Sequence, residues 1–176
     1  PACHGHRMIL STWTYEDPKE RKKKMKNLTQ PLIAGAGATV AILILAYLRD
    51  QFGTELWLMA PFGATTVLVF GIPNSPLAQP KNVIFGHLIT SIIGLTFVQF
   101  LGVEYLSLAL ATGLGVFAML ATKTTHPPAG ANPILIMLAQ PGWTFLINPV
   151  IAGAVVIVAV GAVYRIWIEQ SELRQA

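Results

Sequence analysis

Hydrophobic positions along this chain are gathered into long apolar stretches that short polar segments separate. From residue 31 onward, five stretches approach the length of a membrane helix: residues 31–48, 56–72, 83–103, 105–122 and 145–164. About 20 apolar residues are needed for a helix to span the hydrocarbon core of a bilayer. The pattern therefore predicts an all-α integral membrane protein, with one transmembrane domain over residues 31–168 and a polar C-terminal tail over residues 169–176.

Proline and glycine interrupt this pattern at two places. One is residues 61–65, "PFGAT", and the other is residues 123–133, "KTTHPPAGANP", which precede a short apolar run. That run can form only about eight helical residues, or roughly 12 Å of helix, which is less than half a bilayer. Both places are therefore predicted to be broken or re-entrant helices.

The two interrupted segments resemble each other. "PFGATTVLVF" from Pro61 aligns with "PAGANPILIM" from Pro128, and "VIFG" from Val83 aligns with "VIAG" from Val150 at the same offset. Two separate matches at one offset indicate an internal duplication. We expect two repeats of three segments each, over about residues 31–103 and 104–168.

The duplicated motif predicts where a ligand would bind. Thr65 and Asn132 occupy the same place in the two copies, and both residue types favour helix N-caps. A helix that begins inside the membrane presents free N–H groups and a positive dipole end, which favour an anion. The predicted substrate-binding residues are Gly63, Ala64, Thr65, Thr66, His126, Gly130, Ala131 and Asn132. The alternative is that proline and glycine only kink ordinary helices.

Charge is scarce and unevenly placed. Only 11% of the residues are charged, and half of the lysines and arginines lie within residues 19–26. Such a run before an apolar segment predicts a cytoplasmic N-terminal segment, residues 1–30, that faces anionic lipid; binding to nucleic acid is not expected. The same rule favours six crossings over four, because six place Lys81 and Lys123 on the cytoplasmic side together with Arg165 and Arg174.

Three further polar residues are candidates for a vestibule or a gate. Lys81 and Lys123 either draw anions toward the membrane or mark its inner interface. His87 lies alone in an apolar stretch, where it is either a hydrogen-bonded packing residue or a functional one.

The sequence gives little support to catalysis. It contains no Gly-x-Ser-x-Gly, no His-Glu-x-x-His and no pair of carboxylates within an apolar stretch. Cys3, His4 and His6 carry metal-ligating atoms, but a metal site needs fixed geometry, which a chain terminus does not provide. We therefore expect neither an enzyme nor a cofactor or metal.

The second motif segment resembles the signature of a known family. "THPPAGANP" is similar to the signature of the HPP family of integral membrane proteins, named for His126, Pro127 and Pro128, and the likeness continues through "APFGATTVL" and "PLAQPKN". It covers about residues 30–168. It implies that Pro61, Pro127, Pro128 and Pro133 form a structural motif and that nitrite is the cargo, as for members in cyanobacteria and chloroplasts. Members are usually described with four spans.

Together these observations predict a transporter or channel for a small inorganic anion, with nitrite foremost. It would lie in a bacterial inner membrane or a chloroplast envelope. The alternative is a membrane-embedded scaffold or sensor whose Pro/Gly motif is purely structural. Small-residue faces at Gly35-x-Gly37 and Gly113-x-Gly115 suit close helix contact and predict a homo-oligomer.

Overall fold

The computed structural model describes residues 28–53 and 55–173. Most of the predicted basic N-terminal segment, with Cys3, His4 and His6, and also Arg174 lie outside the described residues. The chain divides into two units, residues 1–32 and 33–176. Only residues 28–32 of the first unit are described, and four of these begin helix α2.

Every regular element in the described part of the chain is helical, and no strand occurs there. The long α-helices are α2 (Thr29–Phe52), α4 (Pro80–Leu101), α5 (Tyr105–Ala121) and α7 (Ala152–Leu173). The short α-helices are α3 (Ala60–Thr66) and α6 (Asn132–Ala139). Tight 3-10 turns form η1 (Glu55–Leu58), η3 (Pro76–Ala78), η4 (Pro127–Ala131) and η5 (Trp143–Leu146), and π-helical turns form η2 (Val67–Gly71) and η6 (Ile147–Ile151).

The prediction of an all-α membrane fold is confirmed. Three helical segments are long and apolar enough to cross a bilayer, namely Thr29–Phe52, Pro80–Leu101 and Trp143–Gln170. Large apolar side chains also remain on the outside of the unit, for example Phe100 at 72% and Phe117 at 65% exposure. Such surface is unfavourable in water and suits contact with lipid.

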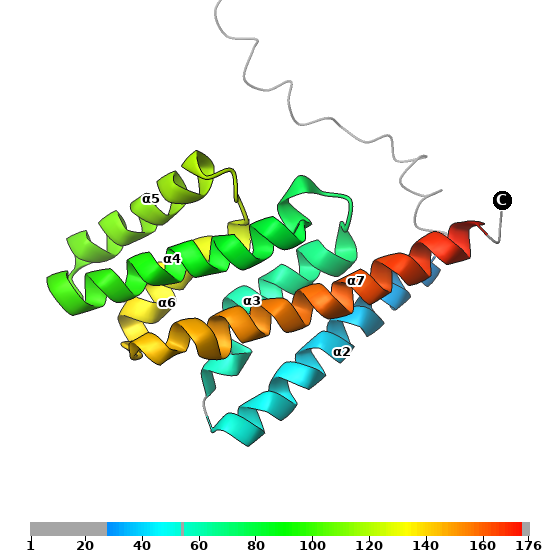
Figure 1. Ribbon diagram of the computed structural model, residues 1–176, viewed down its shortest axis with the longest axis horizontal. Coiled ribbons are helices and arrows are strands. Elements are labelled where there is room, and N and C mark those ends of the chain that lie inside the picture. Colours follow the sequence, from blue (N-terminus) through cyan, green and yellow to red (C-terminus); the bar gives the residue numbers. More distant parts are fainter. Residues whose placement is uncertain (1–27, 54, 174–176) are drawn as a thin grey trace, which may run out of the picture. The chain divides into compact units, whose positions relative to one another are not determined.

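The broken segments run from one end of the unit to the other. His126 Nδ1 lies 2.8 Å from the carbonyl oxygen of Leu77, so the segments 72–79 and 122–126 meet at one end. At the opposite end, Trp143 Nε1 donates to Gln99 Oε1 at 2.6 Å, which places the segment before α7 beside the end of α4. The segment that holds α3 therefore starts at the second end and finishes at the first, and the segment that holds α6 does the reverse (Figure 1).

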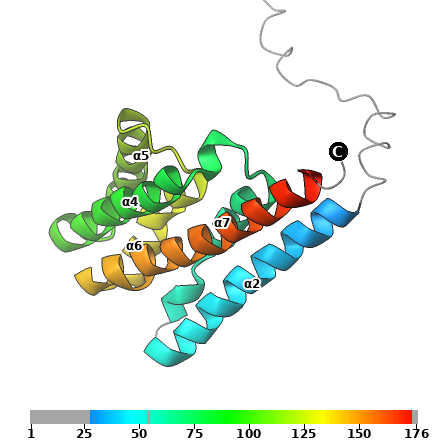
Figure 2. The ribbon, with the colours of Figure 1, turned by 45° about the vertical axis from the view of Figure 1, so that its right-hand side comes forward.

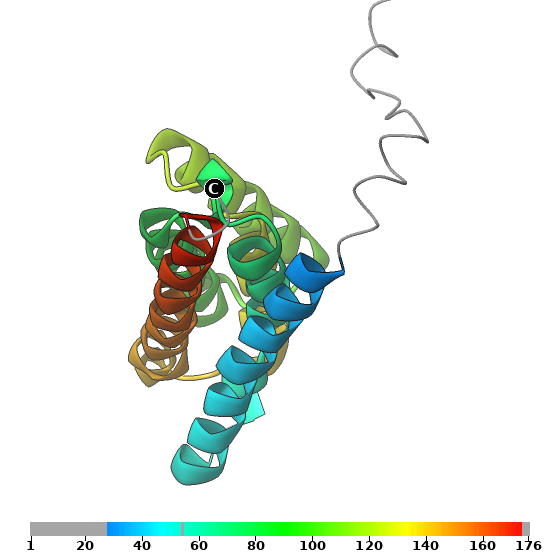
Figure 3. The same cartoon turned by 90° about the vertical axis from the view of Figure 1, so that its right-hand side faces the viewer.

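Helix α4 is the centre of the packing. It contacts α5, α6 and α7, and it lies between α5 and α7 in two views (Figures 1 and 2). Figure 3 views the unit from the end at which α7 terminates. Gly94 allows α6 to approach α4 closely, because a Cβ atom at Gly94 would lie 3.1 Å from the Cα atom of Pro133. The buried apolar core includes Leu45, Phe62, Val83, Ile136 and Ile157.

The order of the elements repeats along the chain. The first half consists of a long helix (α2), a segment with the Pro-x-Gly-Ala motif (α3 and η2), a 3-10 turn (η3) and a long helix (α4). The second half has the same order, with α5, then η4 and α6, then η5, and then α7. In each motif segment the helix changes type, from α to π after Thr66 and from 3-10 to α at Asn132, and we call these two segments the interrupted helices. This order agrees with the predicted repeats, while the duplication itself stays a prediction.

The alternating direction of the six segments leads to a test of topology. In a variant with Cys3 replaced, cysteines at Lys81 and Lys123 should react with an impermeant thiol reagent from the same side of the membrane, and a cysteine at Tyr105 from the other. The positive-inside rule predicts that the lysine side is the cytoplasm. Labelling of Lys123→Cys and Tyr105→Cys from one side would contradict six crossings.

Candidate functional site

The two Pro-x-Gly-Ala segments lie side by side and run in opposite directions. Thr65 of α3 reaches His126, which precedes η4, with Oγ1 2.9 Å from Nε2. The two segments also meet where Pro61 and Ala131 border one cavity of about 510 Å³. The segments that the sequence marked as repeats therefore form one structural unit inside the domain.

The prediction that Thr65 and Asn132 cap helices is wrong. The N-cap of α3 is Met59 and that of α6 is Ala131, and neither makes a side-chain capping bond. Proline fixes a φ angle that suits the first turn of a helix, so helical structure starts at Ala60 and Pro127, directly after the extended residues Met59 and His126. Thr65 and Asn132 thus follow a helical turn instead of starting one.

Part of the backbone around the predicted anion site cannot donate to a ligand. Pro61 and Pro133 have no N–H group, Phe62 N–H donates to the Met59 carbonyl at 2.9 Å, and Asn132 N–H donates to Ala129. Gly63 and Ala64 are exposed within α3, and Gly130 and Ala131 lie in η4. Their role in binding stays a prediction, and side chains become the stronger candidates for ligand contact.

Six polar side chains meet at the centre of the domain, and we call them the buried polar cluster. Each is at most 1% exposed. Its members are Thr65, His87, Thr90, Ser91, His126 and Asn132. They come from α3, α4, α6 and the segment before η4, so the cluster joins both motif segments.

His87 is held from both sides by equivalent residues of the two motifs. Thr65 Oγ1 lies 2.9 Å from His87 Nε2, and Asn132 Nδ2 lies 3.0 Å from His87 Nδ1. The two motifs therefore share one imidazole instead of forming two capped helix ends. His87, predicted at a vestibule or gate, is fully buried among the predicted binding residues.

The hydrogen-bond partners of His87 and His126 determine which nitrogen of each neutral imidazole carries the proton. Leu77 offers only a carbonyl oxygen to His126 Nδ1, so this nitrogen carries the proton and Nε2 is free to accept. Asn132 donates to His87 Nδ1, so the proton of His87 lies on Nε2 and is donated to Thr65 Oγ1. The Thr65 hydroxyl can donate in turn to His126 Nε2 or to the Pro61 carbonyl, both at 2.9 Å.

The neighbours of Asn132 determine the orientation of its side-chain amide and leave its Oδ1 atom unpaired. Its amide nitrogen faces the His87 carbonyl oxygen at 3.2 Å, which can only accept, and the hydroxyl oxygens of Thr90 and Ser91 at 3.1 Å. The Oδ1 atom is buried with no donor within hydrogen-bond distance among the described residues. An unpaired buried acceptor typically costs about 1–3 kcal/mol.

Aromatic rings close one side of the cluster. The ring of Phe62 meets that of His87 edge-on with centroids 5.2 Å apart, and His87 meets His126 in the same way at 5.1 Å. Phe62 is fully buried. Because apolar and aromatic side chains surround these polar groups, their hydrogen bonds form in a medium of low dielectric constant.

The remaining predicted residues lie around this cluster. Thr66 donates to the Gly63 carbonyl at 2.7 Å and stays outside the cluster. Lys81 and Lys123 are exposed at the end where segments 72–79 and 122–126 meet. Of the motif prolines, Pro61, Pro128 and Pro133 are buried and Pro127 is exposed.

Thr90 and Ser91 were not predicted. They follow His87 by three and four residues, and this spacing places all three on one face of α4. Polar residues at such spacing within an apolar helix were the signal that could have identified them.

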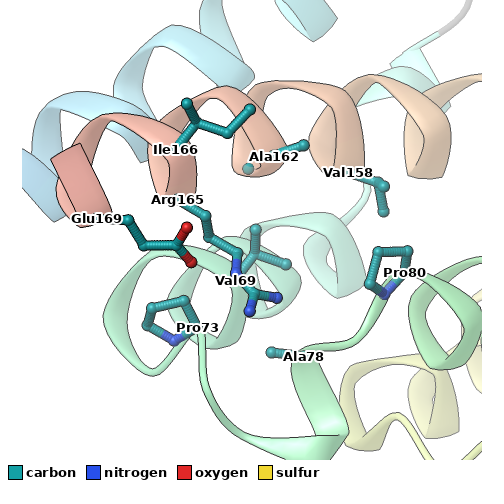
Figure 4. Close-up of a pocket in the computed structure, with 10 residues that line it drawn as sticks. Val69, Pro73, Ala78, Pro80, Val158, Ala162, Arg165, Ile166 and Glu169 are labelled. Carbon is teal, nitrogen blue, oxygen red and sulfur yellow. The ribbon is translucent and has the colours of Figure 1, made fainter.

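A second cavity, of about 280 Å³, lies at the lysine end. Its lining includes Ala78, Pro80, Arg165 and Glu169, and Arg165 Nη1 lies 3.5 Å from Gln79 Oε1. Figure 4 shows Arg165 and Glu169 reaching from α7 toward residues 73–80. Ala78 follows Leu77, whose carbonyl holds His126, but no member of the cluster lines this cavity. In the described part of the chain, no group of three metal-ligating side chains comes together.

The packing of α4 against the cluster predicts a sensitive glycine. A Cβ atom on Gly86 would lie 2.9 Å from His126 Cβ and 3.1 Å from the Thr124 carbonyl oxygen. Gly86→Ala should therefore lower the free energy of unfolding by about 1–3 kcal/mol, the usual cost of overpacking. Gly71→Ala is the matched control, since a Cβ atom there meets nothing within 4 Å. Thermal unfolding in detergent measures both, and equal stability of the two variants would contradict this packing.

Comparison with known proteins agrees with the resemblance seen in the sequence. A transmembrane protein of Dictyostelium discoideum is 36% identical over 126 residues, which are 65% of this chain and 40% of that protein. A second transmembrane protein of the same organism is 29% identical over 126 residues, or 66% of this chain and 44% of that protein. The chain thus spans less than half the length of these relatives. No solved structure matches it.

A family comparison covers more of the chain. The family model described as "HPP, transmembrane region" matches residues 23–172, a range that contains both motif segments and every residue of the buried polar cluster. The membrane character of the fold agrees with this match. The chain therefore belongs to the HPP transmembrane family.

Proposed function

We propose that this protein is a membrane transporter or channel for a small inorganic anion, with nitrite as the first candidate, and that it is not an enzyme. The observation that carries the proposal is the buried polar cluster. Six polar side chains lie at the centre of an apolar domain, where polar groups are expensive to place and usually serve a function.

The architecture supports the same proposal. Two interrupted helices that run in opposite directions meet at the cluster, which is a common arrangement around the binding sites of secondary transporters. Cavities of about 280 and 510 Å³ border the two flanks of the paired motif segments. A solute would have space beside both motif segments, although no cluster residue lines either cavity.

Charges near the lysine end would concentrate anions there. Lys81 and Lys123 are exposed, and Arg165 lines the nearby cavity. At the opposite end, Arg49 lies 3.8 Å from Asp50, whose carboxylate reduces its positive potential. A positive potential at a cavity mouth raises the local concentration of anions. This supports the assignment of Lys81 and Lys123 to a vestibule.

A scaffold or sensor is the second candidate, and one observation favours it. The cluster is fully buried and nearly all of its polar atoms are paired, as a purely structural network would be. The two candidates differ in what they predict for flux, because a scaffold moves no ion. We place the protein in a bacterial inner membrane or a chloroplast envelope, with its N-terminus in the cytoplasm.

Purified protein in liposomes tests the proposed function. We expect nitrite flux above that of protein-free liposomes, and Asn132→Leu should reduce this flux about tenfold, the factor that corresponds to roughly 1.4 kcal/mol. Thr96→Val is the matched control, because the Thr96 hydroxyl bonds only to the Ile92 carbonyl of its own helix. Parallel assays with nitrate, chloride and formate define the ion. Absence of flux for all four anions would favour the scaffold.

We also propose a homo-oligomer. Each predicted small-residue face contains one glycine that packs within the chain: a Cβ atom on Gly37 would meet Phe70, and one on Gly115 would meet Pro133. A Cβ atom on Gly35 or Gly113 would meet nothing within 4 Å. The open glycines leave room for a helix of a second copy. Mass measurement in mild detergent and in lipid should give a dimer, and a monomer in both would contradict this proposal.

A further inference from the structure

The buried polar cluster is composed of neutral groups, and its unpaired atom is an acceptor. Asn132 is 1% exposed, and its Oδ1 atom lacks a donor among the described residues. The His87 carbonyl, which can only accept, lies 3.2 Å from the amide nitrogen and favours this amide orientation. An anion is itself an acceptor and cannot pair with Oδ1, whereas a solute with an O–H group can.

Charged and titratable groups of the neighbouring elements lie away from the two imidazoles. Elements α3, η4 and α6 contain no Lys, Arg, Asp, Glu or Tyr, and α5 contains only Tyr105, at 88% exposure. Helix α4 contributes Lys81, which is exposed. In α7, Tyr164 donates to the Phe70 carbonyl at 2.8 Å, and Arg165 and Glu169 line the cavity at the lysine end.

This environment disfavours a bare anion at the cluster. An ion taken from water into an apolar interior costs several kcal/mol unless an opposite charge compensates it. Here the partners within reach are hydroxyl, amide and imidazole groups. A neutral acid avoids this cost and can donate its O–H to Asn132 Oδ1.

We propose that the anion passes the buried polar cluster together with a proton, as its neutral conjugate acid. This inference rests on the proposed function and specifies its substrate class. The protein would carry anions of weak acids, such as nitrite and formate, and would discriminate against anions of strong acids, such as nitrate and chloride. One anion and one proton cross together, so no net charge moves.

The hydrogen-bond chain provides the proton. When His126 binds a proton from water at Nε2, Thr65 Oγ1 can accept the new N–H, since these atoms are 2.9 Å apart. Transfer to an oxygen of the anion breaks that N–H bond, forms an O–H bond and restores the neutral ring. On the far side the acid releases its proton to water. The Thr65 hydroxyl connects His126 with His87 throughout.

Two hollows border residues that adjoin the cluster along the chain. The cavity of about 280 Å³ includes Ala78, which follows Leu77, and the open groove of about 510 Å³ includes Ala131, which precedes Asn132. No member of the buried polar cluster lines either hollow. Passage of the acid therefore requires the cluster to open toward both.

Liposomes that contain the protein and an internal pH indicator test the inference. Nitrite or formate outside should acidify the interior faster than in protein-free liposomes, which report passive permeation of the acid. The rate should not change when a potassium ionophore clamps the membrane potential. Flux of nitrate and chloride should be less than about a tenth of nitrite flux.

The outcomes separate the two proposals. Nitrate or chloride flux equal to that of nitrite, with movement of net charge, would overturn the inference and leave the proposed function intact. Absence of flux for every anion would overturn both. These measurements use the wild-type protein, so they do not depend on the folding of a variant.

Variants at Thr65 test the hydrogen-bond chain itself. Thr65→Val keeps the shape and removes the hydroxyl, so proton-coupled nitrite flux should fall about tenfold. Thr65→Ser keeps the hydroxyl and should retain most of the flux, and Thr96→Val should match the wild type. A folded Thr65→Val variant with wild-type, proton-coupled flux would overturn the role of this chain.

Discussion

The two hydrogen bonds that hold His87 are the constraint on which the arrangement of the domain depends. One ring nitrogen pairs with Thr65 and the other with Asn132, at 2.9 and 3.0 Å. In an apolar interior an imidazole that lost either partner would carry the cost of an unpaired buried group. The two interrupted segments, which start at opposite ends of the unit, must therefore meet at the same turn of α4.

The face of α4 that meets them is adapted to this contact. His87, Thr90, Ser91 and Gly94 follow one another at helical spacing, so they form one stripe. The polar members bind the motif side chains, and Gly94 lets the backbone of α6 approach. On the outer face Phe85 and Ile92 are exposed toward lipid. One helix thus combines a lipid-facing side with a polar stripe, and its sequence reads as almost uniformly apolar because the polar residues are few.

The sequence predicted the class of fold and the location of the site but not the contacts within it. Apolar length and the paired Pro-x-Gly-Ala motifs sufficed to identify a membrane domain with two interrupted helices. The equivalence of Thr65 and Asn132 was also visible, and the two residues do share a role. Local propensity suggested that this role was capping, whereas each side chain instead pairs with His87, 22 and 45 residues away. Sequence spacing does not reveal which distant partner a buried polar group meets, and in a low-dielectric interior that partner outweighs the local preference.

Under the proposed transport function, a neutral cluster would allow a buried site to be selective and still release its cargo. A buried cation or a ring of free amides would hold an anion strongly, and strong binding at the narrowest point slows its departure. In this domain the described cationic side chains at the lysine end, Lys81, Lys123 and Arg165, are exposed or line a cavity, where they can raise the local anion concentration. At the cluster, the proposed discrimination would come from hydrogen bonding, because an O–H group can satisfy Asn132 Oδ1 and a bare anion cannot. The two proposals thus assign attraction and selection to different residues, which would allow each to act without trapping the solute.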